Sequence, residues 1–130
     1  MAAASSFRDI RAWQNAMQLT VDIYHLTGSL PATERPGLST SLQQAALSIP
    51  TLIASGHKTG SRSGMQSACL RSLEAASELE SLLIVTGQLY PNVPSNDLLD
   101  QLEEVQGLIR LLIKRLSSIK PPTPPRRKTV

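Results

Sequence analysis

A strictly spaced row of apolar residues in the C-terminal third of the chain limits the fold more than any other feature. The spacing alternates between four and three residues along Leu98, Leu102, Val105, Ile109, Leu112, Leu116 and Ile119. Such a pattern is typical of a helix that packs at a shallow angle against neighbouring helices. Ser95 precedes the row as a suitable N-cap, and Pro121 follows it. We therefore expect a long C-terminal helix whose one side is buried by other helices.

Three further helices are predicted upstream, from apolar spacing and from the residues that end helices. Their expected ranges are 7–27, 33–55 and 63–89, with Thr33 as an N-cap and residues 56–61 as a C-cap and loop. Pro50 lies inside the second range, and we expect it to bend this helix without ending it. Short connections between four helices predict an all-α fold, an up-down-up-down antiparallel bundle.

Two apolar rows, instead of one, run along the first and third predicted helices. On the first they are Ile10, Trp13, Met17, Val21 and Tyr24, beside Ala12, Ala16, Leu19, Ile23 and Leu26; on the third, Met65, Cys69, Leu73, Ala76 and Leu83, beside Ala68, Ala75, Leu79, Leu82 and Leu89. Adjacent rows lie ~100° apart, so the apolar side is wider than one seam requires. We expect the surplus to build a ring-like homo-oligomer, with Trp13, Tyr24 and Pro50 at core or interface positions.

Composition favours one cytoplasmic domain over residues 1–119. Aromatic residues make up only 3% of the chain, so the core must be aliphatic. The single cysteine, Cys69, cannot form an intrachain disulfide, which suits a reducing compartment. The first residues lack the apolar run of a signal peptide, and no stretch approaches the ~20 apolar residues of a membrane span.

Positive charge is concentrated in the predicted tail, residues 120–130. Lys120, Arg126, Arg127 and Lys128 lie there, which leaves nine basic against ten acidic residues in 1–119, a net charge of −1. Four prolines in the tail favour an extended, mobile segment. Arg126, Arg127 and Lys128 are therefore candidate phosphate contacts that would not read bases.

Catalytic and metal-binding patterns are weak. His25 and His57 form no pair with metal-ligand spacing, and Cys69 belongs to an apolar row, where a small core residue is expected. Glu80 interrupts that row, and we expect it to be a partly buried hydrogen-bond acceptor. The sequence predicts no catalytic residue, cofactor or metal.

The Gly-rich segment 56–64 is the candidate anion site. It departs from a P-loop because its lysine precedes the second glycine and no strand precedes the segment. Lys58 and Arg62 would still lie beside the N-terminus of the third helix, where an anion is favoured. The alternative is a flexible connection between helices. It is favoured because matches to short motifs are mostly accidental.

The chain resembles, over residues 7–116, the small four-helix-bundle proteins related to those encoded by intervening sequences in bacterial 23S ribosomal RNA genes. The resemblance rests on three motifs: Phe7-x-x-Ile10-x-x-Trp13-Gln14-x-Ala16-Met17, Leu42-x-x-Ala45-Ala46-Leu47-Ser48-Ile49-Pro50 followed by Ile53-Ala54-x-Gly56, and Ala76-Ser77-Glu78-Leu79-Glu80. It implies a bundle that assembles as a ring of five. Some relatives, including accessory proteins of diversity-generating retroelements, act beside RNA or a reverse transcriptase, and the resemblance implies a similar role.

The chain departs from the family pattern at polar positions. Many members carry two arginines where this chain has Gln43 and Gln44, and their Ser-Asn and Glu positions are Thr51-Leu52 and Ser55 here. Two functions remain open. The first is a self-associating scaffold whose main partner is a second copy of itself. The second is a nucleic-acid or nucleoprotein accessory that uses Lys58, Arg62, Arg126, Arg127 and Lys128.

Overall fold

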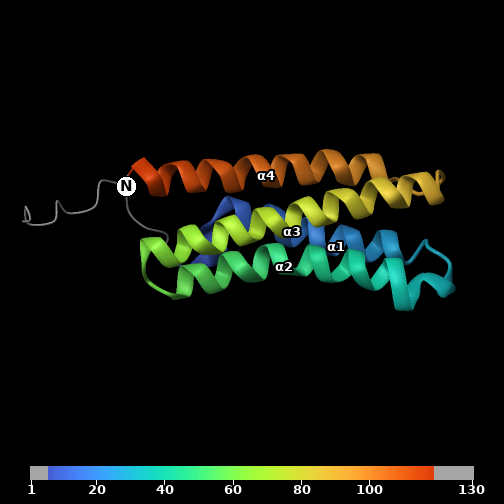
Figure 1. Cartoon of the computed structure of the whole chain (residues 1–130), viewed down its shortest axis with the longest axis horizontal. Coiled ribbons are helices and arrows are strands. Elements are labelled where there is room, and N and C mark those ends of the chain that lie inside the picture. The colour runs from blue at the N-terminus through green and yellow to red at the C-terminus, as the bar shows by residue number, and fades with distance from the viewer. Residues whose placement is uncertain (1–5, 119–130) are drawn as a thin grey trace, which may run out of the picture.

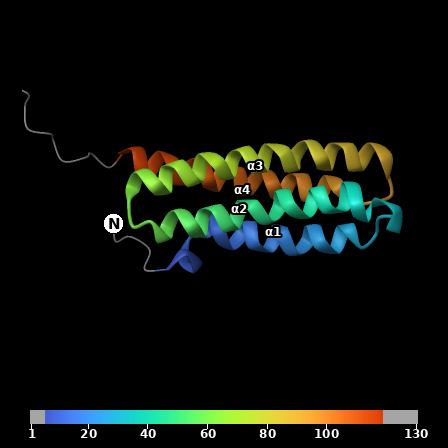
Figure 2. The same cartoon turned by 60° about the horizontal axis from the view of Figure 1, so that its bottom comes forward.

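Four long helices lie side by side in the computed structural model, which describes residues 6–118 (Figure 1). They are α1 (Arg11–Thr27), α2 (Thr40–Lys58), α3 (Arg62–Leu89) and α4 (Ser95–Ser118). Consecutive helices run in opposite directions (Figure 2). α2 and α4 each pack against both α1 and α3. The predicted all-α, up-down-up-down bundle is confirmed for the described residues, and the predicted tail lies outside them.

The chain enters α1 differently from the prediction. Phe7–Asp9 form a short 3-10 helix, η1, whose first turn is capped by the Ser6 hydroxyl. Ile10 is extended, with φ −82° and ψ 120°, so one continuous helix from residue 7 is wrong. The break folds η1 back, and the Phe7 ring packs edge-on against Trp13 with 5.1 Å between ring centroids.

The start of α2 also differs from the prediction. Thr33 is not an N-cap, because it lies inside the short 3-10 helix η2 (Ala32–Glu34). A π-helical turn, η3 (Arg35–Ser39), then precedes α2. Pro36 has no backbone N–H, so it suits this irregular turn. The Thr40 hydroxyl donates to the carbonyl oxygen of Arg35 and so ties the turn to the first residue of α2.

α2 ends later than predicted, because Gly56 is a packing residue and not a helix stop. A Cβ atom on Gly56 would lie 2.4 Å from the Cβ of Ala68 on α3, so the missing side chain lets the two helices approach closely. α2 continues to Lys58. The connection to α3 is only Thr59-Gly60-Ser61, and Gly60 has a φ of +70°, which favours glycine.

Pro50 lies within α2 and is buried, as predicted for a helix that continues through it. A proline cannot donate to the carbonyl four residues earlier, here that of Ala46. The Thr20 hydroxyl of α1 lies 3.1 Å from this Ala46 oxygen and 2.8 Å from the oxygen of Ala16. The single Thr20 proton is shared between these two oxygens, so a side chain of the neighbouring helix offers a donor where the proline cannot.

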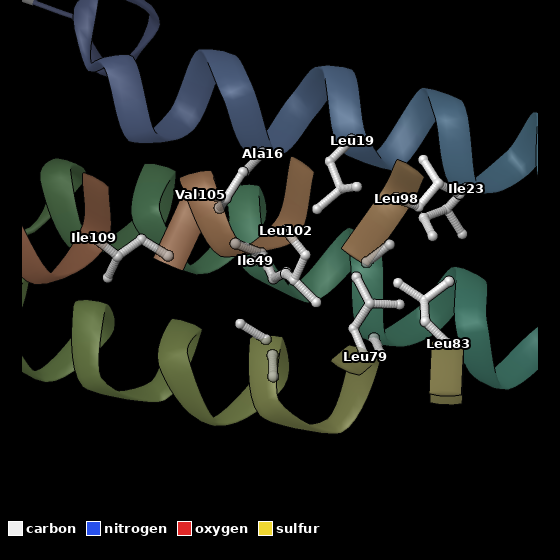
Figure 3. Close-up of a cluster of buried hydrophobic side chains, with 14 of the residues drawn as sticks. Ala16, Leu19, Ile23, Ile49, Leu79, Leu83, Leu98, Leu102, Val105 and Ile109 are labelled. Atoms are coloured by element: carbon white, nitrogen blue, oxygen red, sulfur yellow. The ribbon is translucent and has the colours of Figure 1, made fainter. Parts of the chain in front are cut away.

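The core is aliphatic and lies along the axis of the bundle (Figure 3). The inner α1 row is buried throughout, as are Leu98, Leu102, Val105 and Ile109 of α4. Leu112 and Leu116 are only partly buried against this core, and Ile119 lies outside the described residues. Along the predicted row, burial is most complete at Leu102–Ile109. None of the described helices is long and apolar enough to cross a bilayer.

The expectation of surplus apolar surface in the α3 rows is wrong. Members of both rows are buried or partly buried, except Leu89, which is 58% exposed. α3 needs a wide apolar side because it packs against both α2 and α4. Its other exposed apolar side chains, Leu70, Ile84 and Val85, lie outside both predicted rows.

Candidate interaction surfaces

An exposed apolar surface lies over the contact between α1 and α2. Met17, Val21 and Tyr24 of α1 and Leu47 of α2 are each 40–42% exposed. We call these four residues the α1–α2 patch. The contact between Thr20 and the Ala46 carbonyl sets the two helices in register, and Val21 and Leu47 are the next residues along each helix. The patch therefore brings together the outer row predicted for the first helix and a leucine from its neighbour.

The α1–α2 patch can bury apolar area against another surface. Single exposed apolar residues are ordinary on soluble proteins, whereas grouped ones mark interaction sites. Trp13 is partly buried against the core and Pro50 is buried, so both pack within the monomer. Tyr24, in contrast, is a surface residue.

Basic residues gather at one end of the bundle, where the chain enters α1, turns between α2 and α3, and leaves α4 (Figure 1). We call this the basic end. Its Lys and Arg residues are Arg8, Arg11, Lys58, Arg62, Lys114 and Arg115. The ammonium of Lys58 lies 6.0 Å from the centre of the Phe7 ring, a weak cation–π contact. Lys58 and Arg62 thus belong to a larger basic surface than the sequence suggested.

The Gly-rich segment 56–64 does not form an open phosphate cradle. Ser61 caps α3, because its hydroxyl accepts from the Gly64 amide at 3.0 Å. The Ser61 amide donates to the Thr59 hydroxyl at 3.3 Å. The amides of Ser61 and Gly64 are therefore already bonded, and what Lys58 and Arg62 add for an anion is their charge. Arg126, Arg127 and Lys128 lie outside the described residues.

The other candidates from the sequence are dispersed. His25 lies near the end of α1 and His57 near the end of α2, at opposite ends of the antiparallel pair. Within residues 6–118, no cluster of His, Cys, Asp and Glu side chains could hold a metal. Cys69 is fully buried, and this burial raises the pKa of its thiol to about 11, as expected for a core residue.

Two predicted polar positions connect helices. Glu80 accepts a hydrogen bond of 3.1 Å from the buried amide of Gln106 on α4, which confirms its role as an acceptor, although Glu80 itself is exposed. Gln43 donates to the Thr27 hydroxyl at 3.0 Å and so links α2 to α1. Gln44, its neighbour, is exposed.

Sequence reasoning missed a link between the two connections at the other end of the bundle. The Tyr90 hydroxyl donates to a carboxylate oxygen of Glu34 at 2.5 Å. This hydrogen bond, together with partial burial and the negative charge of Glu34, raises the pKa of Tyr90. The partners are 56 residues apart and lie outside the four long helices, so no periodic pattern indicates the pair.

Comparison with known proteins gives one result for the family. No curated protein matches the chain. The family model described as 23S rRNA-intervening sequence protein matches residues 8–113, which include α1, α2, α3 and most of α4. The matched range also contains most of the three motifs on which the sequence resemblance rests. The chain therefore belongs to the 23S rRNA-intervening sequence protein family.

Proposed function

We propose that this protein is a non-enzymatic, cytoplasmic scaffold that associates with copies of itself through the α1–α2 patch. The observation that carries the proposal is the grouping of four large apolar side chains, each 40–42% exposed, on one face. Burial of apolar area contributes roughly 25 cal/mol per Å², so a patch repeated on every copy favours association.

A closed assembly suits such a surface. If the α1–α2 patch meets a different surface of the next copy, the contacts must close into a ring or grow into fibres. Resemblance to the family favours five copies. Five chains of 14.1 kDa would have a mass of about 70 kDa.

Light scattering with native mass measurement tests the proposal at micromolar concentration. Val21→Glu combined with Leu47→Glu places two charges in the patch, and we expect a shift from the assembly to the monomer mass. Leu70→Glu combined with Leu111→Glu is the matched control, because Leu70 of α3 is 54% exposed and Leu111 of α4 is 43% exposed, both outside the patch. A wild-type monomer, or equal dissociation by the control, would contradict the proposal.

The basic end supports a second candidate function, as an accessory protein that binds nucleic acid. Six Lys and Arg residues converge there, so phosphate contacts would dominate affinity, and binding should weaken steeply with salt. The test is titration of labelled RNA and DNA into the wild type and into Lys58→Gln with Arg62→Gln.

A charge-matched control distinguishes the effect of this surface on affinity from the effect of the protein's net charge. Arg35→Gln with Arg71→Gln removes the same number of charges away from the basic end. We expect the Lys58 and Arg62 variant to lose affinity and the control to retain it. Deletion of residues 120–130 measures the share contributed by Arg126, Arg127 and Lys128. Equal loss in both double variants would exclude a localised site.

A further inference from the structure

The face between α3 and α4 contains a hollow of about 420 Å³. Its lining includes Glu80 and Ile84 of α3 and Leu99, Asp100 and Glu103 of α4. We call it the acidic groove. It also includes Arg110, so its charged lining consists of three carboxylates and one guanidinium. The groove thus combines apolar walls with net negative charge.

The acidic groove lies in the most negative part of the chain. Between Arg71 and Arg110 there are seven Asp and Glu residues and no Lys or Arg. This stretch covers most of α3, the α3–α4 connection and the first half of α4. Because the groove is concave and surrounded by carboxylates, its field attracts cationic groups.

The carboxylate of Glu80 is held in place from beneath. Gln106 is only 6% exposed, and its amide donates to one oxygen of Glu80 at 3.1 Å. Within residues 6–118, the side chains of Asp100 and Glu103 form no hydrogen bond or ion pair. The three carboxylates can therefore accept cationic donors from outside the described bundle.

We propose that the acidic groove binds the C-terminal segment of the same chain through Arg126, Arg127 and Lys128. The reach is sufficient. Glu103 lies 15 residues before Ser118 in α4, or about 22 Å at 1.5 Å per residue. The eight residues from 119 to 126 span about 25 Å at 3.1 Å per residue in an extended conformation.

The composition of the C-terminal segment matches the groove in two further ways. Pro121, Pro122, Pro124 and Pro125 favour an extended backbone, which lowers the entropy lost on docking. Ile84 is 49% exposed and Leu99 is partly buried, so the methylene groups of Arg126 and Arg127 have an apolar wall to contact. Their guanidinium groups can then form paired hydrogen bonds with carboxylates.

A paramagnetic label on the full-length protein tests this docking. Thr129→Cys carries a nitroxide, and buried Cys69 does not compete for the reagent. We expect the amide NMR signals of Ile84, Leu99 and Gly107 to lose most of their intensity relative to the reduced label. Raising the salt to about 1 M, where the Debye length is about 3 Å, should restore them. Full intensity at low salt would overturn the proposal.

Three variants identify the charges involved. Glu80→Gln with Asp100→Asn and Glu103→Gln removes the groove carboxylates, and we expect it to abolish the broadening. Its matched control, Glu74→Gln with Glu78→Gln and Glu104→Gln, removes three exposed carboxylates outside the groove and should retain it. Arg126→Gln with Arg127→Gln and Lys128→Gln should also abolish it without altering the bundle. Equal broadening in both carboxylate variants would overturn the proposal.

A mixed sample determines which chain supplies the segment. Nitrogen-15-labelled protein without the nitroxide is mixed with unlabelled protein that carries it. We expect no broadening in this mixture, because each groove holds its own segment. Broadening of Ile84 and Leu99 would show that another copy supplies it and would overturn docking within one chain. Mass measurement on the same samples reports self-association separately.

Discussion

The hydroxyl of Thr20 lies 3.1 Å from the carbonyl oxygen of Ala46, the acceptor that Pro50 leaves without its usual helical donor. The contact is buried and joins α1 to α2. A buried carbonyl without a donor destabilises a fold by roughly 1–3 kcal/mol. Thr20 therefore offsets the local consequence of a proline within α2, and it does so from a different helix.

A double-mutant cycle tests this relationship. Thr20→Val keeps the shape of the side chain but removes the donor, and we expect it to lower the free energy of unfolding by about 1–3 kcal/mol. In a Pro50→Ala background the new backbone amide at position 50 can donate to the Ala46 carbonyl, so the same change should have a smaller effect. Urea denaturation measures both. Thr51→Val is the control, because the Thr51 hydroxyl is exposed. Equal losses in both backgrounds would contradict the coupling.

Core substitutions in α4 should follow the gradient of burial along its apolar row. Ile109 is fully buried, whereas Leu112 is partly buried. We expect Ile109→Ala to lower the free energy of unfolding by about 2–5 kcal/mol and Leu112→Ala to lower it by about half as much. Midpoints of urea denaturation provide the comparison. A larger loss at Leu112 would show that the core is centred nearer the end of α4.

Periodic features of this fold were predictable from the sequence, and the irregular ones were not. The spacing of Leu98, Leu102 and Ile109 predicts that the segment is helical and also which side of the helix is buried, because both follow from one repeat. The same spacing placed apolar rows on α3, but it could not reveal that two neighbouring helices bury them. An apolar row predicts that its residues are buried, but it does not indicate which helix or which other chain buries them.

Local chemistry explains the remaining differences between prediction and structure. In the sequence, Gly56 is typical of the end of a helix. In the structure it lies within α2, where its missing side chain allows close contact with Ala68. The basic end was not predictable because Arg8, Lys58 and Arg115 are far apart in sequence and meet only once the helices alternate in direction. The acidic groove likewise depends on how α3 and α4 pair.

Two glycine substitutions should have opposite effects on stability. Gly56→Ala places a Cβ 2.4 Å from that of Ala68, so the helices must separate, at about 1–3 kcal/mol. Gly107→Ala in α4 meets nothing within 4 Å, and we expect stabilisation by about 0.5–1 kcal/mol from helix propensity. Thermal unfolding distinguishes the two. Ala68→Gly should partly rescue Gly56→Ala, and a failure to rescue would place the strain elsewhere.

The pH dependence of stability should report the link between Tyr90 and Glu34. The pKa of Tyr90 is raised above its ordinary value of 10.0, chiefly because its hydroxyl donates to Glu34. A raised pKa in the folded state means that the protonated hydroxyl stabilises the fold below about pH 10, and that this contribution disappears as pH rises through the raised value. Tyr90→Phe removes the donor and should lower the melting temperature near neutral pH.

The difference in melting temperature between wild type and Tyr90→Phe should therefore shrink as pH rises above about 10. Tyr24→Phe is the control, because Tyr24 is an exposed side chain that forms no such bond within the described residues. Its difference from wild type should stay small across the same range. Glu34→Gln keeps an acceptor but removes the charge, so it should retain part of the stabilisation. A Tyr90→Phe difference that persists unchanged into alkali would show that it does not depend on the protonated Tyr90 hydroxyl, and would contradict the proposed hydrogen-bond link.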